Sequence, residues 1–535
     1  KNSIKERVAM KNKKTLHLAI ALAISSMPLF GVAEAARGSM YGGESVGDDV
    51  TIEASANAYP TFVGHAFGIY TNVTNSATVT SAGNRLTITT TGEAGDGIRS
   101  NPSGDSNWQN ATGTINVGDG LTITVSGNSA DGLNINGSTV LNIGDNATIN
   151  TLYNGELKYS NGDTSDGAHA VRANFHATIN IGEGLTAGTL GESSHAVYAA
   201  HGRSVRNNPT NGSNINIGKG AVLSTAGKGS HTVMMASNNG KIVIGEDAKM
   251  TTLGDGAHGV AAYADTSGKG SEANGTVEIG AGSTIATAGA GSHGVFANMT
   301  GSVLSLDDNV GITTEGDASH GLLAQRGVIE AGDGLNISVE GSGSHGAYVN
   351  AATGSIEFLG GATIDNNDND GYAIYADKGT ITGTAGNSTF NITGNMYADN
   401  SGSIDLDMDN NSVFTGSTAL ANSGTINLNL KNNSYWHVTS SSEVSSLHVS
   451  GGSMVNLSYE AGMNTVVTVD DLSGSGGVFK FNTELDSEAN GDKLVINSSE
   501  TGSTHYVHVN DLSLINGEVS GEKKLHLITD NSSNA

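Results

Sequence analysis

The chain contains no cysteine, only 4 prolines and 5% aromatic residues among its 535 residues. Without cysteine, neither disulfide bonds nor thiolate metal sites can hold the fold together. So few large side chains cannot fill one thick globular core, so a thin, repetitive architecture fits the composition better. The 76 glycines, with abundant Thr, Asn and Ser, indicate many short strands joined by tight turns.

Basic residues are also scarce, because 25 Lys and Arg stand against 52 Asp and Glu, which gives a net charge of −27. Nucleic acid is therefore excluded as a partner, since its phosphates would be repelled. Acidity of this kind promotes solubility and gives no indication of calcium binding. The sequence predicts no cofactor.

The first 35 residues have the pattern of a secretory signal peptide. Lysines at 11, 13 and 14 precede an apolar run from Leu16 to Phe30, and Ala33-Glu34-Ala35 supplies the small residues that signal peptidase requires. The alternative, a membrane anchor, needs about 20 apolar residues, and this run is shorter and contains Pro28. We therefore predict export, with cleavage between Ala35 and Ala36.

A repeat becomes visible when the middle of the chain is aligned on its histidines. In six copies the histidine follows the same position of the first strand by 13 residues, as in Gly182 to His195 and Gly218 to His231. Successive histidines are 25 to 27 residues apart, apart from two steps of 35 and 36 residues that carry insertions between the units. Three short alternating strands per unit, separated by glycine turns, are typical of one coil of a parallel β-helix.

The repeat histidines occupy one angular position of the predicted coil: His169, His195, His231, His258, His293, His320 and His345. The alternation of residues groups them with inward Val and Ala side chains, so we interpret them as a structural ladder. A line of residues rising by about 4.8 Å per coil brings at most two ligands together, too few for a tight metal site. We predict no metal, and a loss of stability when the histidines are protonated.

Three residues after the repeat position, the side chain is expected to point outward. Aromatic residues at this position are Tyr198, Phe296, Tyr348 and Tyr375. They form a candidate contact stripe that could stack on sugars or on another β-helix. The alternative is that inserted loops cover them.

The repeat divides the chain into segments. We expect an N-terminal cap and irregular coils over residues 36–165, regular histidine-containing coils over 166–376, and a second type of coil over 377–446. In the second type, a unit beginning at Gly402 recurs 22 residues later at Gly424. Residues 447–535 have strong alternation, including Phe479 and Phe481, and are interpreted as a capping module.

The end of the chain resembles the C-terminal passenger segment of pertactin-like and AIDA-type autotransporters. The likeness lies in YWHV, SLHVSGGSMVNL, VDDLSGSGGVFKFNTELDSEANGDKLVI and HYVHVNDLS, in that order from Tyr435 to about Leu527. The resemblance implies a right-handed β-helix, Sec-dependent export and passage across the outer membrane through a C-terminal β-barrel. It also implies that residues 447–535 act as an autochaperone-like cap that folds first.

No run of barrel strands follows residue 531. We therefore expect the outer-membrane translocator to lie outside this chain, as it would for a fragment, a truncated gene product or a two-chain system. With a translocator the protein would reach the cell surface, the outer membrane or the medium, and without one it would stay in the periplasm.

The primary hypothesis is a non-enzymatic type V secretion passenger that serves as an adhesin or in self-association, aggregation and biofilm formation. Its expected partners are host glycans or matrix, or the same protein on neighbouring cells. One alternative is a carbohydrate-active β-helix enzyme, whose carboxylates would come from acidic runs such as Asp307-Asp308, Asp365 to Asp370, Asp405 to Asp409 and Asp470-Asp471. The other is a truncated remnant without function.

Overall fold

The computed structural model describes residues 40–532, except for 56–66, 74–77, 93–94, 103–111, 154–166, 201–211, 264–273, 367–369, 460–463, 486 and 514–523. The predicted signal peptide and its cleavage site at Ala35 and Ala36 lie outside the described residues. So do the two long insertions between repeat units. Among the described residues there is no α-helix, and hence none that is long and apolar enough to cross a bilayer.

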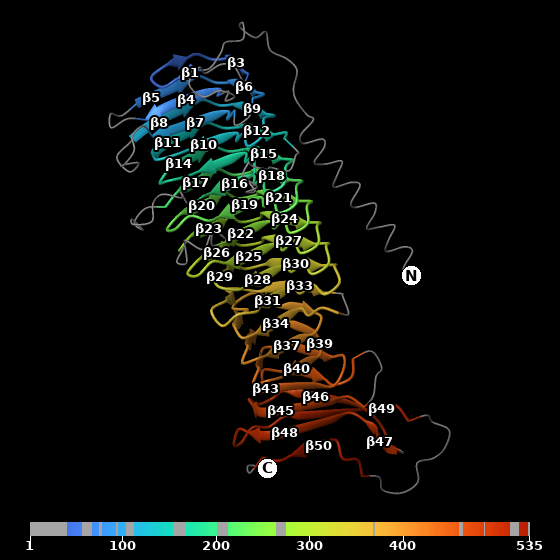
Figure 1. Cartoon of the computed structure of the whole chain (residues 1–535). Helices are drawn as coiled ribbons and strands as arrows, with labels where there is room; N and C mark the ends of the chain where they lie inside the picture. Colours follow the sequence, from blue (N-terminus) through green and yellow to red (C-terminus); the bar gives the residue numbers. More distant parts are fainter. Residues whose placement is uncertain are drawn as a thin grey trace. The chain divides into compact units, whose positions relative to one another are not determined.

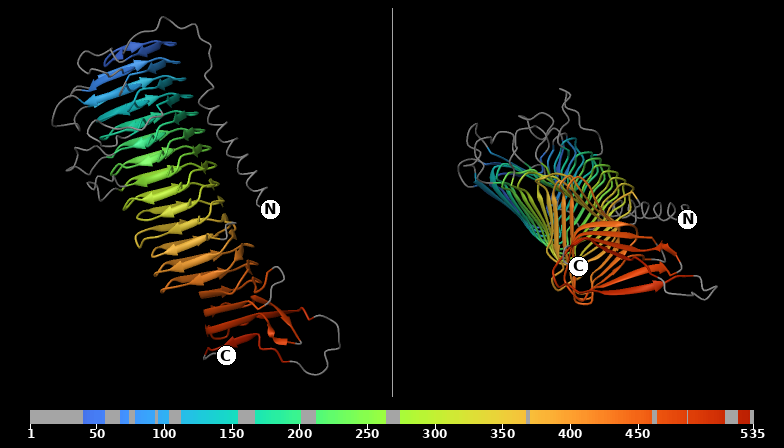
Figure 2. Two further views of the ribbon diagram at one scale, coloured as in Figure 1. Left: turned by 45° about the vertical axis from the view of Figure 1, so that its right-hand side comes forward. Right: turned by 90° about the horizontal axis from the view of Figure 1, so that it is seen from below.

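The chain forms two compact units, Lys1–Gly294 with Asn298–Leu304, and Val295–Ala297 with Ser305–Ala535. In both units each coil supplies one strand to each of three parallel sheets (Figure 1). The coils of each unit are stacked as rungs, with strands of one sheet in register (Figure 2). This confirms the predicted all-β fold, a right-handed parallel β-helix.

In the first unit, the first sheet contains β1 (Met40–Tyr41), β4 (Ile69–Val73), β7 (Ile98–Pro102), β10 (Leu133–Ile135), β13 (Val171–Ala173), β16 (Val197–Ala199), β19 (Val233–Met235) and β22 (Val260–Tyr263). The second contains β2 (Ser45–Val46), β5 (Thr78–Ala82), β8 (Thr112–Val117), β11 (Ser138–Ile143), β14 (Thr178–Ile181), β17 (Asn214–Ile217), β20 (Lys241–Ile244) and β23 (Thr276–Ile279). The third contains β3 (Thr51–Ala54), β6 (Thr87–Thr90), β9 (Thr122–Val125), β12 (Thr148–Thr151), β15 (Thr186–Thr189), β18 (Val222–Thr225), β21 (Lys249–Thr252) and β24 (Thr284–Thr287).

The division between the units falls within β25 (Val295–Asn298) and β26 (Val303–Leu306). In the second unit, the first sheet continues with β28 (Leu322–Ala324), β31 (Ala347–Val349), β34 (Ile374–Asp377), β37 (Met396–Asp399) and β40 (Thr418–Leu420). The second contains β29 (Val328–Ala331), β32 (Ser355–Phe358), β35 (Thr380–Thr384), β38 (Ser403–Met408), β41 (Thr425–Leu430), β43 (Ser442–Val449), β45 (Val466–Ser473), β48 (Lys493–Ser499) and β50 (Ile528–Asp530). The third contains β27 (Gly311–Thr314), β30 (Leu335–Val339), β33 (Ala362–Asn366), β36 (Asn391–Thr393), β39 (Val413–Gly416), β42 (Tyr435–Val438), β44 (Met454–Asn456), β46 (Val478–Glu484) and β49 (Tyr506–Asp511), and β47 (Ser487–Gly491) pairs antiparallel with β46.

The core is a set of apolar columns, one residue per coil, inside each unit. Ile52, Ile88, Ile123 and Ile149 are register partners along the third sheet, and none of them is exposed. Like residues stacked at the spacing of neighbouring strands bury apolar area while the backbone groups of successive coils pair. The alternating pattern that predicts the strands is therefore also the pattern that fills the core.

The coils of the second type turn on pairs of asparagines. Asn410 and Asn411, and one coil later Asn432 and Asn433, have positive φ angles between 49° and 66°. Asparagine tolerates this left-handed conformation better than most residues because its short side chain bonds locally. The repeated Asn-Asn-Ser sequence is thus the turn that closes each of these coils.

Candidate functional site

The repeat histidines accept hydrogen bonds from the backbone of the next coil. In the first unit the N–H of His195 donates to Nδ1 of His169 at 3.0 Å, and the N–H of His231 donates to Nδ1 of His195 at 3.0 Å. His258 and His293 continue the series at 2.9 and 3.0 Å. In the second unit, Nδ1 of His320 accepts from the N–H of His345, and Nδ1 of His345 accepts from that of Tyr372, both at 3.0 Å.

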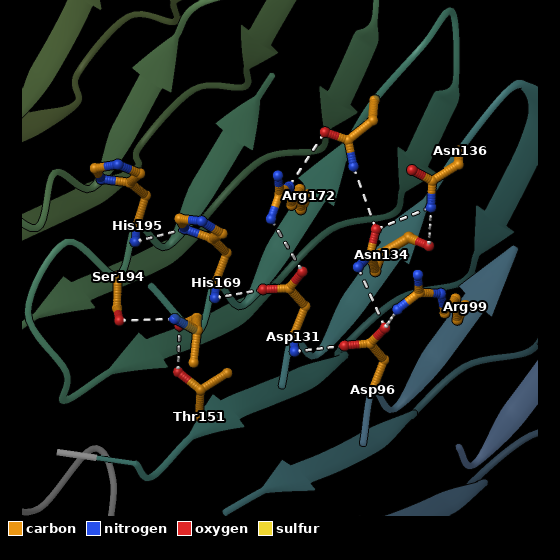
Figure 3. A network of polar contacts seen from close by, with 12 residues as sticks. Asp96, Arg99, Asp131, Asn134, Asn136, Thr151, His169, Arg172, Ser194 and His195 are labelled. Carbon is orange, nitrogen blue, oxygen red and sulfur yellow. Dashed lines mark hydrogen bonds and ion pairs between the residues drawn. The ribbon is translucent and has the colours of Figure 1, made fainter. Parts of the chain in front are cut away.

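Other acceptors replace histidine at the same position of the coil. Oδ1 of Asp96 accepts from the N–H of Asp131 at 2.7 Å, and Oδ1 of Asp131 accepts from that of His169 at 2.8 Å (Figure 3). In the second unit, Oδ1 of Asn395 accepts from the N–H of Ser417 at 2.9 Å. What this position requires is therefore a side-chain acceptor for one buried backbone N–H per coil, since leaving that group unpaired is costly. We call this series the acceptor column.

The imidazole rings also stack on one another. The ring centroids of His195 and His231, and of His231 and His258, are 4.8 Å apart, with planes within 6°. The rings of His320 and His345 stack in the same way at 4.8 Å. Except for the half-buried His345, the repeat histidines are at most 9% exposed. Each ring therefore packs between its neighbours along the unit.

The prediction that these histidines point inward with Val and Ala is wrong. Their rings contact tyrosines at outward positions, as the ring of Tyr198 does with both His169 and His195. The physical reason is a bend at the residue after each histidine. That residue points inward: a Cβ on Gly259 would collide with Ile285 of the third sheet. The strict alternation of a straight strand does not extend across the bend.

The hydrogen-bond pattern fixes the chemistry of the imidazoles. Nδ1 accepts a bond and is unprotonated, so the proton of the neutral ring is on Nε2. Burial lowers the pKa of His231 to about 3 and that of His293 to about 4. With Nε2 protonated, that nitrogen offers no lone pair to a metal, and no metal-ligating cluster occurs among the described residues.

A charged network lies at the aspartates of the acceptor column (Figure 3). Nη1 of Arg99 is 2.9 Å from Oδ2 of Asp96, and Nη1 of Arg172 is 3.6 Å from Oδ2 of Asp131. Burial raises the pKa of both carboxyls, and the neighbouring arginines oppose that shift. Asp96 and Asp131 are 0% and 2% exposed, so they cannot meet a bulky substrate. This network is built for structure.

The predicted outward stripe is not uniformly exposed. Tyr198, Tyr348 and Tyr375 are half-buried, whereas Phe296 is only 6% exposed and offers little surface. In the first unit, Met234 and Ala261 at the same angular position are also buried, packed with Tyr198. The rings of Tyr348 and Tyr375 stack with centroids 4.7 Å apart. The stripe therefore offers aromatic surface mainly in the coils of β31 and β34.

The acidic runs that could serve an enzyme lie in different coils. Oδ1 of Asp308 accepts the N–H of Asp333 at 2.9 Å, Asp407 pairs with Lys431 at 2.7 Å, and Oδ1 of Asp470 accepts from Asn497 at 2.8 Å. These carboxylates are engaged in turn and cross-coil bonds on the outside of the units. The described residues bring no two of these runs to one point.

Two members of the acceptor column are absent from the sequence prediction. Asp96 follows Gly83 by 13 residues, the same spacing that identifies Asp131 and the histidines, so the spacing rule could have found it. Asn395 has no glycine at that spacing. Its role depends on the coil geometry alone.

No family model matches the chain, and no curated protein matches it. Among solved structures, the chain is similar to a chain in the cryo-EM structure of the Vag8–C1 inhibitor complex, with 15% identity and a TM-score of 0.42, covering 90% of this chain and 100% of that one. It is also similar to the autotransporter UpaB from E. coli strain CFT073, with 14% identity and a TM-score of 0.23, covering 92% of each chain.

Proposed function

We propose that this chain is the exported passenger of an autotransporter and acts as a non-enzymatic surface protein in adhesion or self-association. The passenger assignment is supported by the sequence resemblance from Tyr435 to about Leu527, which lies on the last coils of the second unit. An outer-membrane β-barrel translocator is the partner that export requires. Host glycans or matrix, or the same protein on another cell, are the partners for contact.

The observation that carries the adhesive function is the distribution of reactive groups. Acid–base catalysis on a glycan needs two carboxylates that flank one bond. The acidic runs Asp307-Asp308, Asp405 to Asp409 and Asp470-Asp471 instead occupy separate coils, and the buried Asp96 and Asp131 are screened from solvent. Stacked coils with regular side faces suit repeated weak contacts along a long surface.

The test is surface display of residues 1–535 fused to a bacterial translocator barrel. Protease treatment of intact cells should release passenger fragments, and the displaying cells should settle faster or adhere to matrix-coated plates more than cells with the barrel alone. The single variants Asp405→Asn and Asp470→Asn should keep this behaviour, because an adhesive face does not depend on one carboxylate. A displayed passenger that changes neither settling nor adherence would contradict the adhesive function, and a protected one would contradict export.

A further inference from the structure

Three tyrosines form a stack on the outer face of the first sheet of the second unit. Tyr348, Tyr375 and Tyr397 are register partners on β31, β34 and β37. Their ring centroids are 4.7 and 5.1 Å apart, with interplanar angles of 12° and 32°. Tyr372, which follows the last histidine of the acceptor column, also stacks on Tyr397 at 5.2 Å. One face of Tyr397 is therefore packed by the tyrosines of the preceding coil.

The other face of Tyr397 is turned to a coil without a ring. The register partner of Tyr397 on β40 is Ala419, which is exposed. The described residues place no aromatic ring on that side of Tyr397, and a methyl group cannot cover a phenol ring. The stack thus ends in a flat aromatic surface one coil above Ala419.

Hydrogen-bonding groups border this surface. Asp377 and Asp399 are register partners two residues after Tyr375 and Tyr397. Nδ2 of Asn400 donates to Oδ1 of Asp377 at 2.9 Å, and Nδ2 of Asn422 donates to Oδ1 of Asp399 at 2.8 Å. The rim therefore offers carboxylate acceptors and amide donors beside an apolar plane.

We propose that the open face of Tyr397 is a sugar-binding platform that takes a neutral hexopyranose of a glycan. The C–H face of the pyranose would lie where a ring at position 419 would stack, and its hydroxyl groups would bond to Asp399 and Asn422. This inference rests on the adhesive function proposed above and names the class of its ligand.

Charge decides which partner fits the platform. Acidic sugars would be repelled by Asp377 and Asp399 on a chain of net charge −27. A basic peptide fits less well, because both carboxylates already accept bonds from asparagines and Nζ of Lys378 is 3.8 Å from Asp377. An uncharged polyol that stacks on an aromatic plane remains as the ligand class.

The experiment measures binding of the purified full chain to immobilised probes: hexamers of glucose and of N-acetylglucosamine, a lactose-terminated glycan, its sialylated counterpart, and a hexa-arginine peptide. The decisive variant is Ala419→Tyr, which keeps every wild-type polar group and covers the open face by extending the stack. We expect at least one neutral glycan to bind, and Ala419→Tyr and Tyr397→Ala to weaken its binding by about tenfold. Tyr506→Ala removes a 69% exposed tyrosine elsewhere and should leave binding unchanged.

Three results would overturn the platform: no neutral probe binds, the arginine peptide alone binds, or a neutral probe binds Ala419→Tyr as well as wild type. Circular dichroism of Ala419→Tyr, with an unchanged β spectrum, separates loss of the surface from loss of folding. Failure of the two proposals is distinguishable. If displaying cells with Ala419→Tyr still settle or adhere like wild type, the adhesive function stands and the platform does not mediate it.

Discussion

The backbone N–H of His231 donates a hydrogen bond to Nδ1 of His195 at 3.0 Å, and the two rings stack with centroids 4.8 Å apart. One side chain thus satisfies a backbone donor of the next coil and packs against the same residue of that coil. Because both contacts require a neutral ring, the stability of the coils is linked to pH.

Acid should destabilise the histidine coils. Unfolded histidines titrate near pH 6.5, whereas in the folded chain the pKa is about 3 for His231 and about 4 for His293. Below pH 6.5 the unfolded state binds more protons, so stability that is present above this pH is lost progressively down to about pH 4. Each buried histidine should contribute about 1.4 kcal/mol per pH unit in this window. Urea midpoints at pH 7.5, 6 and 5 measure the effect, and equal midpoints would contradict it.

Two substitutions of His195 should separate the hydrogen bond from the stacking. His195→Asn keeps a side-chain acceptor, as Asn395 provides at its own coil, while His195→Phe keeps a stacked ring and removes the acceptor. An unpaired buried N–H costs about 1–3 kcal/mol, so the Phe variant should be the less stable one. Amide hydrogen exchange of His231 reads this directly, and it should accelerate in His195→Phe. Faster exchange in the Asn variant would mean that stacking matters more than the hydrogen bond.

The sequence predicts the strands, the coil length and the column of histidines, because all three repeat at a fixed spacing. It fails where geometry replaces periodicity. The bend at Ala170 and Gly259 turns the preceding histidines outward, and nothing in an alternating pattern marks such a bend. Likewise Asp131 and Asn395 look like solvated turn residues in the sequence, and only the coil stacking makes them buried or cross-coil acceptors.

The carboxylate of Asp131 should be replaceable by an amide. Its Oδ1 accepts from His169, and burial raises the pKa of the carboxyl, so its charge lowers stability at neutral pH. Asp131→Asn retains the acceptor and removes the desolvated charge, and Arg172 keeps a bond of 3.1 Å to Asn174. We expect thermal stability at pH 7.5 within about 1 kcal/mol of wild type, and a loss of about 2–4 kcal/mol for Asp131→Leu. Equal losses in both variants would show that the ion pair with Arg172 is the contact that matters.

The last coils should depend on Asp492, which is fully buried. Its Oδ1 accepts from the Ser458 hydroxyl at 2.6 Å and the Thr465 N–H at 3.0 Å, and Oδ2 accepts from the Asn482 N–H at 2.7 Å. The carboxylate thus joins β46 to the segment between β44 and β45. Asp492→Ala leaves all three donors unpaired and should cost at least about 3 kcal/mol.

Asp492→Asn should cost less, about 1–3 kcal/mol, because its amide group can still accept from Ser458 and Thr465 but faces the Asn482 N–H with a donor. Asp470→Asn on β45 is the matched control, since Asp470 is exposed and should shift stability by no more than about 0.5 kcal/mol. Limited proteolysis followed by mass spectrometry locates the opening. If these coils nucleate the fold, Asp492→Ala should also slow refolding from urea after correction for stability. An unchanged refolding rate would leave Asp492 a stabilising contact formed after the rate-limiting step.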